Sequence, residues 1–110
     1  MTQQYQQPGD AVNGARLFMA RCNQCHTISQ GGMHKAGPNL FNVVGRKAGT
    51  QPFYFFSQAH TNSGVVWTEE NLFKYLENPK AFVPGTKKSF MGVKNPQDRS
   101  DIIAFLKEAR

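Results

Sequence analysis

Apolar residues recur at helical spacing in three places along the chain, each time after a polar residue suited to cap a helix. The first of these places begins near Asp10, a favourable N-terminal cap. Apolar residues then follow at the spacing of one helix face, at Val12, Ala15, Phe18 and Met19. The pattern predicts a helix that starts at Asp10 and runs into the segment around Cys22.

A second helix is predicted after Thr68, which is also a good N-cap. Two glutamates follow it, where carboxylates interact favourably with the positive end of a helix. The expected apolar face consists of Leu72, Phe73 and Leu76. Asn78-Pro79 should end this helix, because the residue before a proline disfavours helical geometry.

The third predicted helix has Asn95 as its cap and Pro96 at its first position, where proline is preferred. Its buried stripe is expected to consist of Ile102, Ile103, Phe105 and Leu106. Gly14 and Phe18 of the first helix, together with Phe105, favour a close crossing of the first and last helices. The same aromatic residues also fit an ordinary core.

Between these helices, glycine and proline interrupt the chain so often that long elements have little room. No strand alternation, repeat or second domain is evident. A length of 110 residues suits one domain. We therefore expect an all-α fold with one domain over residues 10–110, preceded by a mobile, Gln-rich extension over residues 1–9.

Thirteen Lys and Arg against seven Asp and Glu give a formal net charge of +6. This excess favours docking to acidic protein surfaces or to anionic lipid. No recognition motif points to nucleic acid. No stretch reaches transmembrane length, and the N-terminus lacks the features of a secretory signal. Either a signal has been removed, or the protein reaches its compartment without one.

The two cysteines of the chain lie in Cys22-Asn23-Gln24-Cys25-His26, which is the attachment pattern for covalent haem. Two thioether bonds hold one edge of the porphyrin, and the two-residue spacer matches the separation of the vinyl groups. The imidazole that follows stands where it can ligate iron. Two other chemistries compete. Zinc usually needs paired Cys/His ligand spacing, and a thioredoxin-like redox pair needs a surrounding βαβ pattern. A thiol pair without a function is the third alternative.

Over about residues 9–109, the sequence resembles mitochondrial-type cytochrome c, a class I c-type cytochrome. The resemblance starts with the segments Pro8-Gly9-Asp10, Cys22-Asn23-Gln24-Cys25-His26-Thr27 and Gly37-Pro38-Asn39-Leu40. It continues through Gly45-Arg46, Trp67, Tyr75-Leu76-Glu77-Asn78-Pro79, Pro84-Gly85-Thr86-Lys87, Asp98-Arg99 and Asp101-Ile102-Ile103-Ala104-Phe105-Leu106. It implies the small class I cytochrome c fold, with helices and loops wrapped around one covalent haem c.

The resemblance also implies roles for single residues. Cys22 and Cys25 would form the thioethers, and His26 would be the proximal iron ligand. The carbonyl of Pro38 would accept a hydrogen bond from the imidazole and orient the ring. The other implied haem contacts are Arg46 and Trp67 at a buried propionate, Tyr75 and Thr86 on the distal side, and Phe90 over the haem edge.

The sequence departs from the family at the second axial ligand. The family has methionine directly after Pro-Gly-Thr-Lys, and here that residue is Lys88. Three outcomes stay open. The amine of Lys88 ligates iron after losing its proton, at a cost of about 4.6 kcal/mol at pH 7 that a low-dielectric pocket reduces. Alternatively, Met91 reaches the iron, or water or a small ligand occupies the position.

The function implied by the resemblance is one-electron transfer in the respiratory chain, not enzymatic turnover of a substrate. Its partners would be redox proteins with acidic docking surfaces, contacted around Lys35, Lys80, Lys87 and Lys94, and we expect a monomer. An open or labile distal site predicts the alternative, a ligand-binding haem protein with weak peroxidase-like activity. The family implies the mitochondrial intermembrane space, with the bacterial periplasm as the alternative location.

Overall fold

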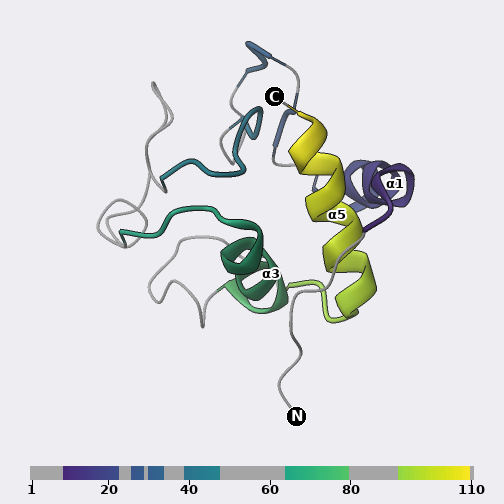
Figure 1. Cartoon of the computed structure of the whole chain (residues 1–110). Coiled ribbons are helices and arrows are strands. Elements are labelled where there is room, and N and C mark those ends of the chain that lie inside the picture. The colour runs from purple at the N-terminus through teal and green to yellow at the C-terminus, as the bar shows by residue number, and fades with distance from the viewer. Residues whose placement is uncertain are drawn as a thin grey trace.

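The computed structural model describes residues 9–22, 26–28, 30–33, 39–47, 64–79 and 92–109 (Figure 1). These residues form three α-helices, α1 (Ala11–Arg21), α3 (Glu69–Glu77) and α5 (Pro96–Glu108). The only strand-like pairing among them is an isolated antiparallel bridge between Lys47 and Val66. The described part of the chain therefore confirms the predicted all-α class. Residues 1–8 lie outside it, so the boundary of the N-terminal extension stays a prediction.

All three helices begin at the predicted capping residues. The side chain of Asp10 accepts hydrogen bonds from the backbone of the first turn of α1. Thr68 caps α3 in the same way, and Asn95 caps α5. Pro96 occupies the first position of α5, where its missing N–H costs nothing. Each cap satisfies backbone donors that have no partner within the helix.

The ends of the first two helices also agree with the sequence. The chain leaves α1 at Cys22, whose amide donates to the Phe18 carbonyl, so the helix does run into the cysteine motif. Asn78 is the C-terminal cap of α3, directly before Pro79. The close of α3 therefore follows from the proline that was expected to stop it.

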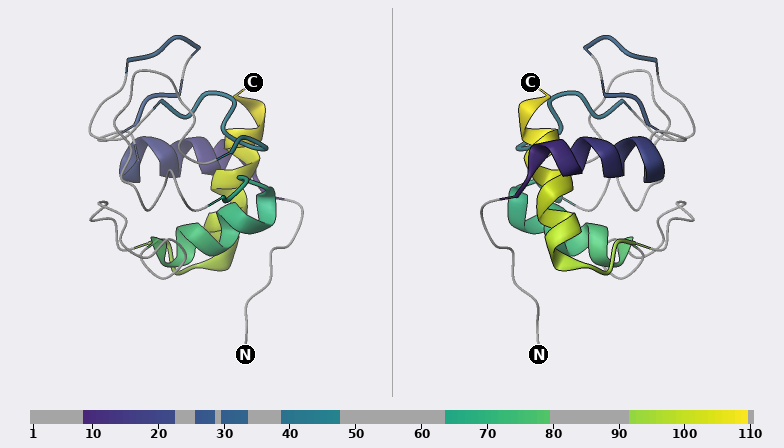
Figure 2. Two further views of the ribbon diagram at one scale, coloured as in Figure 1. Left: turned by 90° about the vertical axis from the view of Figure 1, so that its left-hand side faces the viewer. Right: turned by 90° about the vertical axis from the view of Figure 1, so that its right-hand side faces the viewer.

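Helix α5 crosses both α1 and α3, and this arrangement is visible in both views of Figure 2. At the crossing with α1, Gly14 is buried and lies against the backbone carbonyl of Asp101. The rings of Phe18 and Phe105 pack with their centroids 5.4 Å apart. The expected close crossing of the first and last helices is confirmed, and it depends on the absence of a side chain at Gly14.

The predicted apolar face of α1 was partly wrong. Val12 is 82% exposed and Met19 is 62% exposed, whereas Gly14, Leu17 and Phe18 are buried. Val12 and Met19 are seven positions apart and so lie on one face, but that face points to solvent. The face of α1 that turns toward α5 is the one that carries Gly14, because only there can the two backbones approach closely. The apolar character of Val12 and Met19 does not change this.

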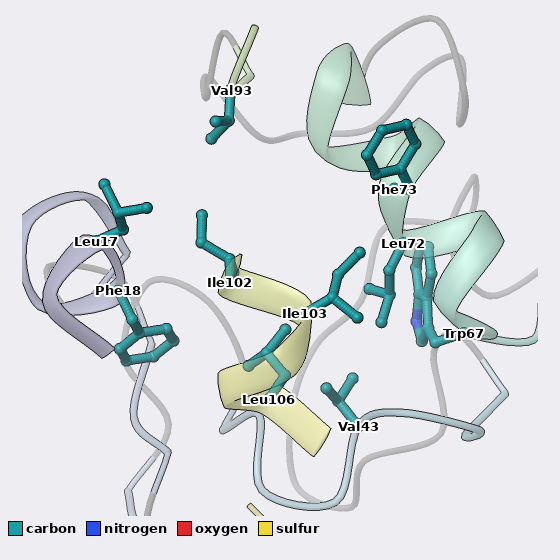
Figure 3. Packing of buried hydrophobic residues seen from close by; sticks show 10 residues of the cluster. All are labelled: Leu17, Phe18, Val43, Trp67, Leu72, Phe73, Val93, Ile102, Ile103 and Leu106. Atoms are coloured by element: carbon teal, nitrogen blue, oxygen red, sulfur yellow. The ribbon is translucent and has the colours of Figure 1, made fainter. Parts of the chain in front are cut away.

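The hydrophobic core lies between the three helices (Figure 3). Helix α5 supplies its centre, with Ile102, Ile103 and Leu106 directed toward side chains from the other elements. The remaining buried members are Leu17 and Phe18 of α1, Leu72 and Phe73 of α3, and Val43, Trp67 and Val93 from the connecting segments.

Two charged residues of α5 are also buried. The guanidinium of Arg99 lies 4.1 Å from the centroid of the Phe73 ring and pairs with the Glu77 carboxylate at 3.1 Å. Asp101 accepts hydrogen bonds from the amide of Asp10 at 2.7 Å and from the side chain of Asn13 at 2.7 Å. These contacts connect α5 to the start of α1 on one side and to the end of α3 on the other.

None of the helices in the described ranges is long and apolar enough to span a membrane.

Candidate functional site

The two described residues of the cysteine motif lie where α1 ends. Cys22 and His26 are each partly buried, and the amide of His26 donates to the Cys22 carbonyl at 3.0 Å. A bond from residue i+4 back to residue i has the α-helical pattern, so the thiol and the imidazole belong to adjacent turns of the chain. Cys22 also packs against the hydrophobic core. The sequence therefore brings the backbones of Cys22 and His26 together, with the Cys22 side chain at the edge of the core.

The segment after His26 is held to Asn39 and Leu40 by hydrogen bonds. The amide of Leu40 donates to the Thr27 carbonyl at 2.8 Å. The Asn39 side chain donates to the Thr27 hydroxyl at 2.7 Å, and this hydroxyl donates to the Met33 carbonyl at 2.8 Å. Three stretches of loop therefore meet at one threonine side chain.

Arg46, Trp67 and Tyr75 form a second group. The amide of Trp67 donates to the Arg46 carbonyl at 2.8 Å, and the amide of Gly45 donates to the Trp67 carbonyl at 2.7 Å. The rings of Trp67 and Tyr75 meet edge to face, with centroids 4.9 Å apart. Trp67 is buried, whereas Arg46 and Tyr75 are partly buried. The structure therefore brings these three predicted site residues together.

Both groups border the same core. Cys22, Leu40 and Tyr75 are partly buried and pack against its buried members. A prosthetic group placed between the cysteine motif and the Trp67–Tyr75 pair would meet apolar side chains as well as these polar ones. That combination is typical of cofactor sites, which are largely apolar with a few placed polar groups.

The residues directly after the Lys88–Met91 region are fixed to the end of α3. The amide of Val93 donates to the Leu76 carbonyl at 2.6 Å, and Nζ of Lys94 donates to the Glu77 carbonyl at 2.5 Å. Gly92, at φ 101°, lies against the backbone of Glu77. Lys94 is exposed, and its side chain caps the end of α3.

The other predicted site residues lie outside the described ranges. These are Cys25, Pro38, Thr86, Lys88, Phe90 and Met91, together with the predicted docking residues Lys35, Lys80 and Lys87. Their roles stay predictions.

The described residues fit a covalently attached haem by the chemistry of their donors. A thiolate forms a thioether, a neutral imidazole nitrogen is a common axial ligand, and both are present one turn apart. The backbone of Arg46 is hydrogen-bonded to that of buried Trp67. A guanidinium and an indole N–H are both donors that suit a carboxylate.

Sequence reasoning did not select Thr27 and Asn39 as site residues. Their hydroxyl and amide are common in loops, and nothing in the composition separates them from other polar residues. The available signal was position, because Thr27 directly follows His26 and Asn39 directly follows Pro38.

Comparison with known proteins identifies the family of this chain. A family model described as cytochrome c matches residues 11–110. Cytochrome c of Theileria annulata is 55% identical over 101 residues, which cover 92% of this chain and 87% of that protein. Cytochrome c of Sesamum indicum is 50% identical over 102 residues, covering 93% and 92%. Cytochrome c of Arabidopsis thaliana is 49% identical over 100 residues, covering 91% and 89%.

Members of this family carry covalently attached haem c and act as electron carriers for partner proteins, not as enzymes. Their eukaryotic members are proteins of the mitochondrial intermembrane space. The match to the family runs from the start of α1 to residue 110, and the all-α fold agrees with it. The chain therefore belongs to the cytochrome c family and is a haem electron carrier with the class I cytochrome c fold.

Proposed function

We propose that haem c is attached to this chain through Cys22 and Cys25, with His26 as the proximal iron ligand. The observation that carries the proposal is the bond from the His26 amide to the Cys22 carbonyl, which keeps a thiol and an imidazole one turn apart. Bound haem supplies reversible one-electron chemistry. The Pro38 carbonyl is the proposed acceptor for the second imidazole nitrogen, which would fix the orientation of the ring.

Arg46, Trp67 and Tyr75 are proposed to line the haem away from the cysteine motif. Arg46 and Trp67 would offset the charge of a propionate, which is costly to bury without a partner. The backbone bond between these two residues supports a common role, because it keeps the guanidinium-bearing residue beside the buried indole. Tyr75, in ring contact with Trp67, would face the distal side together with Thr86. Phe90 would cover the edge.

For the distal ligand we propose Lys88. It occupies the sequence position at which the family has methionine. A lysine ligand must be a neutral amine, and burial favours that form by desolvating the ammonium. A nitrogen ligand in place of a thioether stabilises ferric iron, so the reduction potential should be lower than with a His/Met pair. Met91 and water are the competing ligands.

The physiological role that we propose is electron transfer in the respiratory chain of the mitochondrial intermembrane space, with the bacterial periplasm as the alternative location. The net charge of +6 favours partners with acidic docking surfaces and, secondarily, anionic lipid. Lys94 is exposed and is proposed to belong to the docking surface, with Lys35, Lys80 and Lys87.

One observation favours a second function. The family methionine is absent from position 88, and a weakly held or absent distal ligand would let peroxide or carbon monoxide reach the iron. The protein would then be a ligand-binding haem protein with weak peroxidase-like activity. This alternative keeps the same attachment through Cys22 and Cys25 and differs only in the distal ligand.

Two measurements test these functions. Mass spectrometry of the denatured protein should find haem still bound, and Cys22→Ala should leave only one thioether. A low-spin ferric spectrum without the sulfur-to-iron charge-transfer band at the red edge would support a nitrogen ligand such as Lys88. High-spin ferric iron that binds cyanide readily would refute the carrier function and support the open-site alternative.

A further inference from the structure

The hydroxyl of Thr27 is the centre of a hydrogen-bond arrangement that joins three loop stretches. It accepts a bond from Nδ2 of Asn39 at 2.7 Å and donates to the Met33 carbonyl at 2.8 Å. The Thr27 carbonyl accepts a bond from the amide of Leu40 at 2.8 Å. Oδ1 of Asn39 in turn accepts from the amide of Phe41 at 3.0 Å. Both polar ends of the Asn39 side chain are therefore in use, and its orientation is fixed.

We propose that Thr27 and Asn39, called here the proximal latch, are positioning residues for the imidazole of His26. This inference rests on the proposed roles of His26 as the iron ligand and of the Pro38 carbonyl as the acceptor for its imidazole. His26 is anchored on one side by its amide bond to Cys22. On the other side its next neighbour, Thr27, is bonded to Asn39, the next neighbour of Pro38. The latch therefore holds together Thr27 and Asn39, the sequence neighbours of the proposed imidazole ligand and of its proposed acceptor.

The surroundings of the latch favour a strong and persistent contact. The Asn39–Thr27 bond is partly buried, and the adjacent residues Ile28 and Leu40 pack against the hydrophobic core. Hydrogen bonds shielded from water are electrostatically stronger than exposed ones. Two parallel bonds, one from the Asn39 side chain and one from the Leu40 amide, also resist rotation of the segment better than one bond alone.

The position of an imidazole acceptor affects the metal. A hydrogen bond from the ligating imidazole to a carbonyl raises the basicity of the ligand, and the loss of such partners commonly costs 10–100-fold in metal affinity or activity. A more basic imidazole stabilises ferric iron. When the latch is broken, the imidazole N–H should exchange faster with solvent, and the reduction potential should become more positive.

The test compares variants of the full holoprotein. Thr27→Val keeps the shape of the side chain but removes both bonds of the hydroxyl. Asn39→Leu is similar in size but can neither donate to the Thr27 hydroxyl nor accept from the Phe41 amide. In the cyanide adduct of the ferric protein, NMR should show the His26 imidazole N–H exchanging about tenfold faster in both variants, the factor expected when a hydrogen bond of ordinary strength is lost. Thr27→Ser, which retains the hydroxyl, should behave as the wild type does.

A remote variant separates positioning from a loss of stability. Asn13→Ala, in α1, removes the bond to Asp101 and those from Arg16. It should lower stability while leaving N–H exchange and reduction potential unchanged. Wild-type exchange in both Thr27→Val and Asn39→Leu would overturn the positioning role of the latch but leave the proposed function intact. A wild-type protein whose iron is not bound by His26 would instead overturn the proposed ligand and the latch together.

Discussion

Gly14 lies directly against the backbone carbonyl of Asp101, and no side chain fits between them. A Cβ added at Gly14 would overlap that carbonyl and would also come within 3.0 Å of Cβ of Phe105. The nearest obstacle is backbone, which cannot rotate away as a flexible side chain can. The contact therefore fixes how closely α1 and α5 approach.

Gly14→Ala is expected to destabilise the protein. By helix propensity alone the change would gain about 1 kcal/mol. The overlap with Asp101 should outweigh that gain, because overpacking typically costs about 1–3 kcal/mol and sometimes more. Denaturant unfolding measures the difference. Ala20→Gly, at an exposed position of the same helix, is the control for propensity alone. A more stable Gly14→Ala protein would contradict the close contact.

The carboxylate of Asp101 should make stability depend on acid pH. Burial raises the pKa of this group, but the hydrogen bonds from Asp10, Asn13 and Gln97 outweigh it, and the pKa is lowered from 3.8. A folded pKa below the unfolded one means that the stabilisation is complete above about pH 4. It is lost as the pH falls through the folded pKa.

Asp101→Asn should therefore lose about 1–3 kcal/mol at pH 7, where three donors would face an amide that also carries hydrogens. The free-energy difference between the wild type and this variant should shrink as the pH is lowered below 3.8. Urea unfolding at a series of pH values measures it. Asp98→Asn on the same helix controls for the change in net charge. A difference that stays constant with pH would count against the lowered pKa.

Gly92→Ala should cost stability in two ways. The residue has φ 101°, where a non-glycine residue is strained by about 1–2 kcal/mol. A Cβ would in addition overlap the Glu77 carbonyl. Gly45, at φ 90° with open space around it, is the matched control, because Gly45→Ala adds strain without overlap. Thermal unfolding should show the larger loss for Gly92→Ala, and equal losses would refute the packing argument.

The same Gly92 variant should affect the distal side. Gly92 directly follows the segment that carries Lys88 and Met91, and it fixes that end of the segment to α3. If Gly92→Ala destabilises the attachment of this segment to α3 by about 1.4 kcal/mol, the equilibrium constant for its release rises tenfold. The ferric variant should then bind cyanide about tenfold more tightly than the wild type, as measured by spectroscopic titration.

The proposed Lys88 ligand predicts an asymmetric pair of variants. Lys88→Ala should change the spin state or coordination of ferric iron, because it removes the nitrogen donor. Met91→Ala should leave the absorption spectrum nearly intact. Optical spectra of the two variants distinguish the two ligands. The opposite pattern would identify Met91 as the distal ligand. Unchanged spectra in both variants would favour water or a small ligand.

The helix boundaries were predictable because local chemistry determines them. Asp10, Thr68 and Asn95 cap the helices whatever the rest of the chain does, and Pro79 stops α3. Which face of α1 is buried was not predictable from the positions of its apolar residues, as the exposure of Met19 illustrates. The choice of face is a tertiary effect, determined by how closely α5 approaches.

The site was predictable where one short motif carries it. Cys22 and His26 are close in sequence, and a single turn brings them together. The Arg46–Trp67–Tyr75 group came from the family resemblance, since no local pattern links residues so far apart. Thr27 and Asn39 were missed because their roles depend on a pairing between loops that neither residue signals alone. In the fold, the burial of Arg99 was not predicted either, because it depends on Phe73 and Glu77 of another helix.

The packing of Gly9 against Ser100 brings the start of the described chain close to α5, which bears on circular permutation of the protein. Ser100 lies in α5, and Ala109 is the C-terminal cap of that helix. At a rise of 1.5 Å per residue, Ser100 and Ala109 are about 13 Å apart along the helix. Roughly five extended residues would therefore join them in a circular permutant. Helices α1 and α5 now meet by closing a loop of 91 residues, as the Asp10–Asp101 bond shows. A direct linker would reduce that closure cost by roughly 2–3 kcal/mol and would make the first and last helices neighbours in sequence.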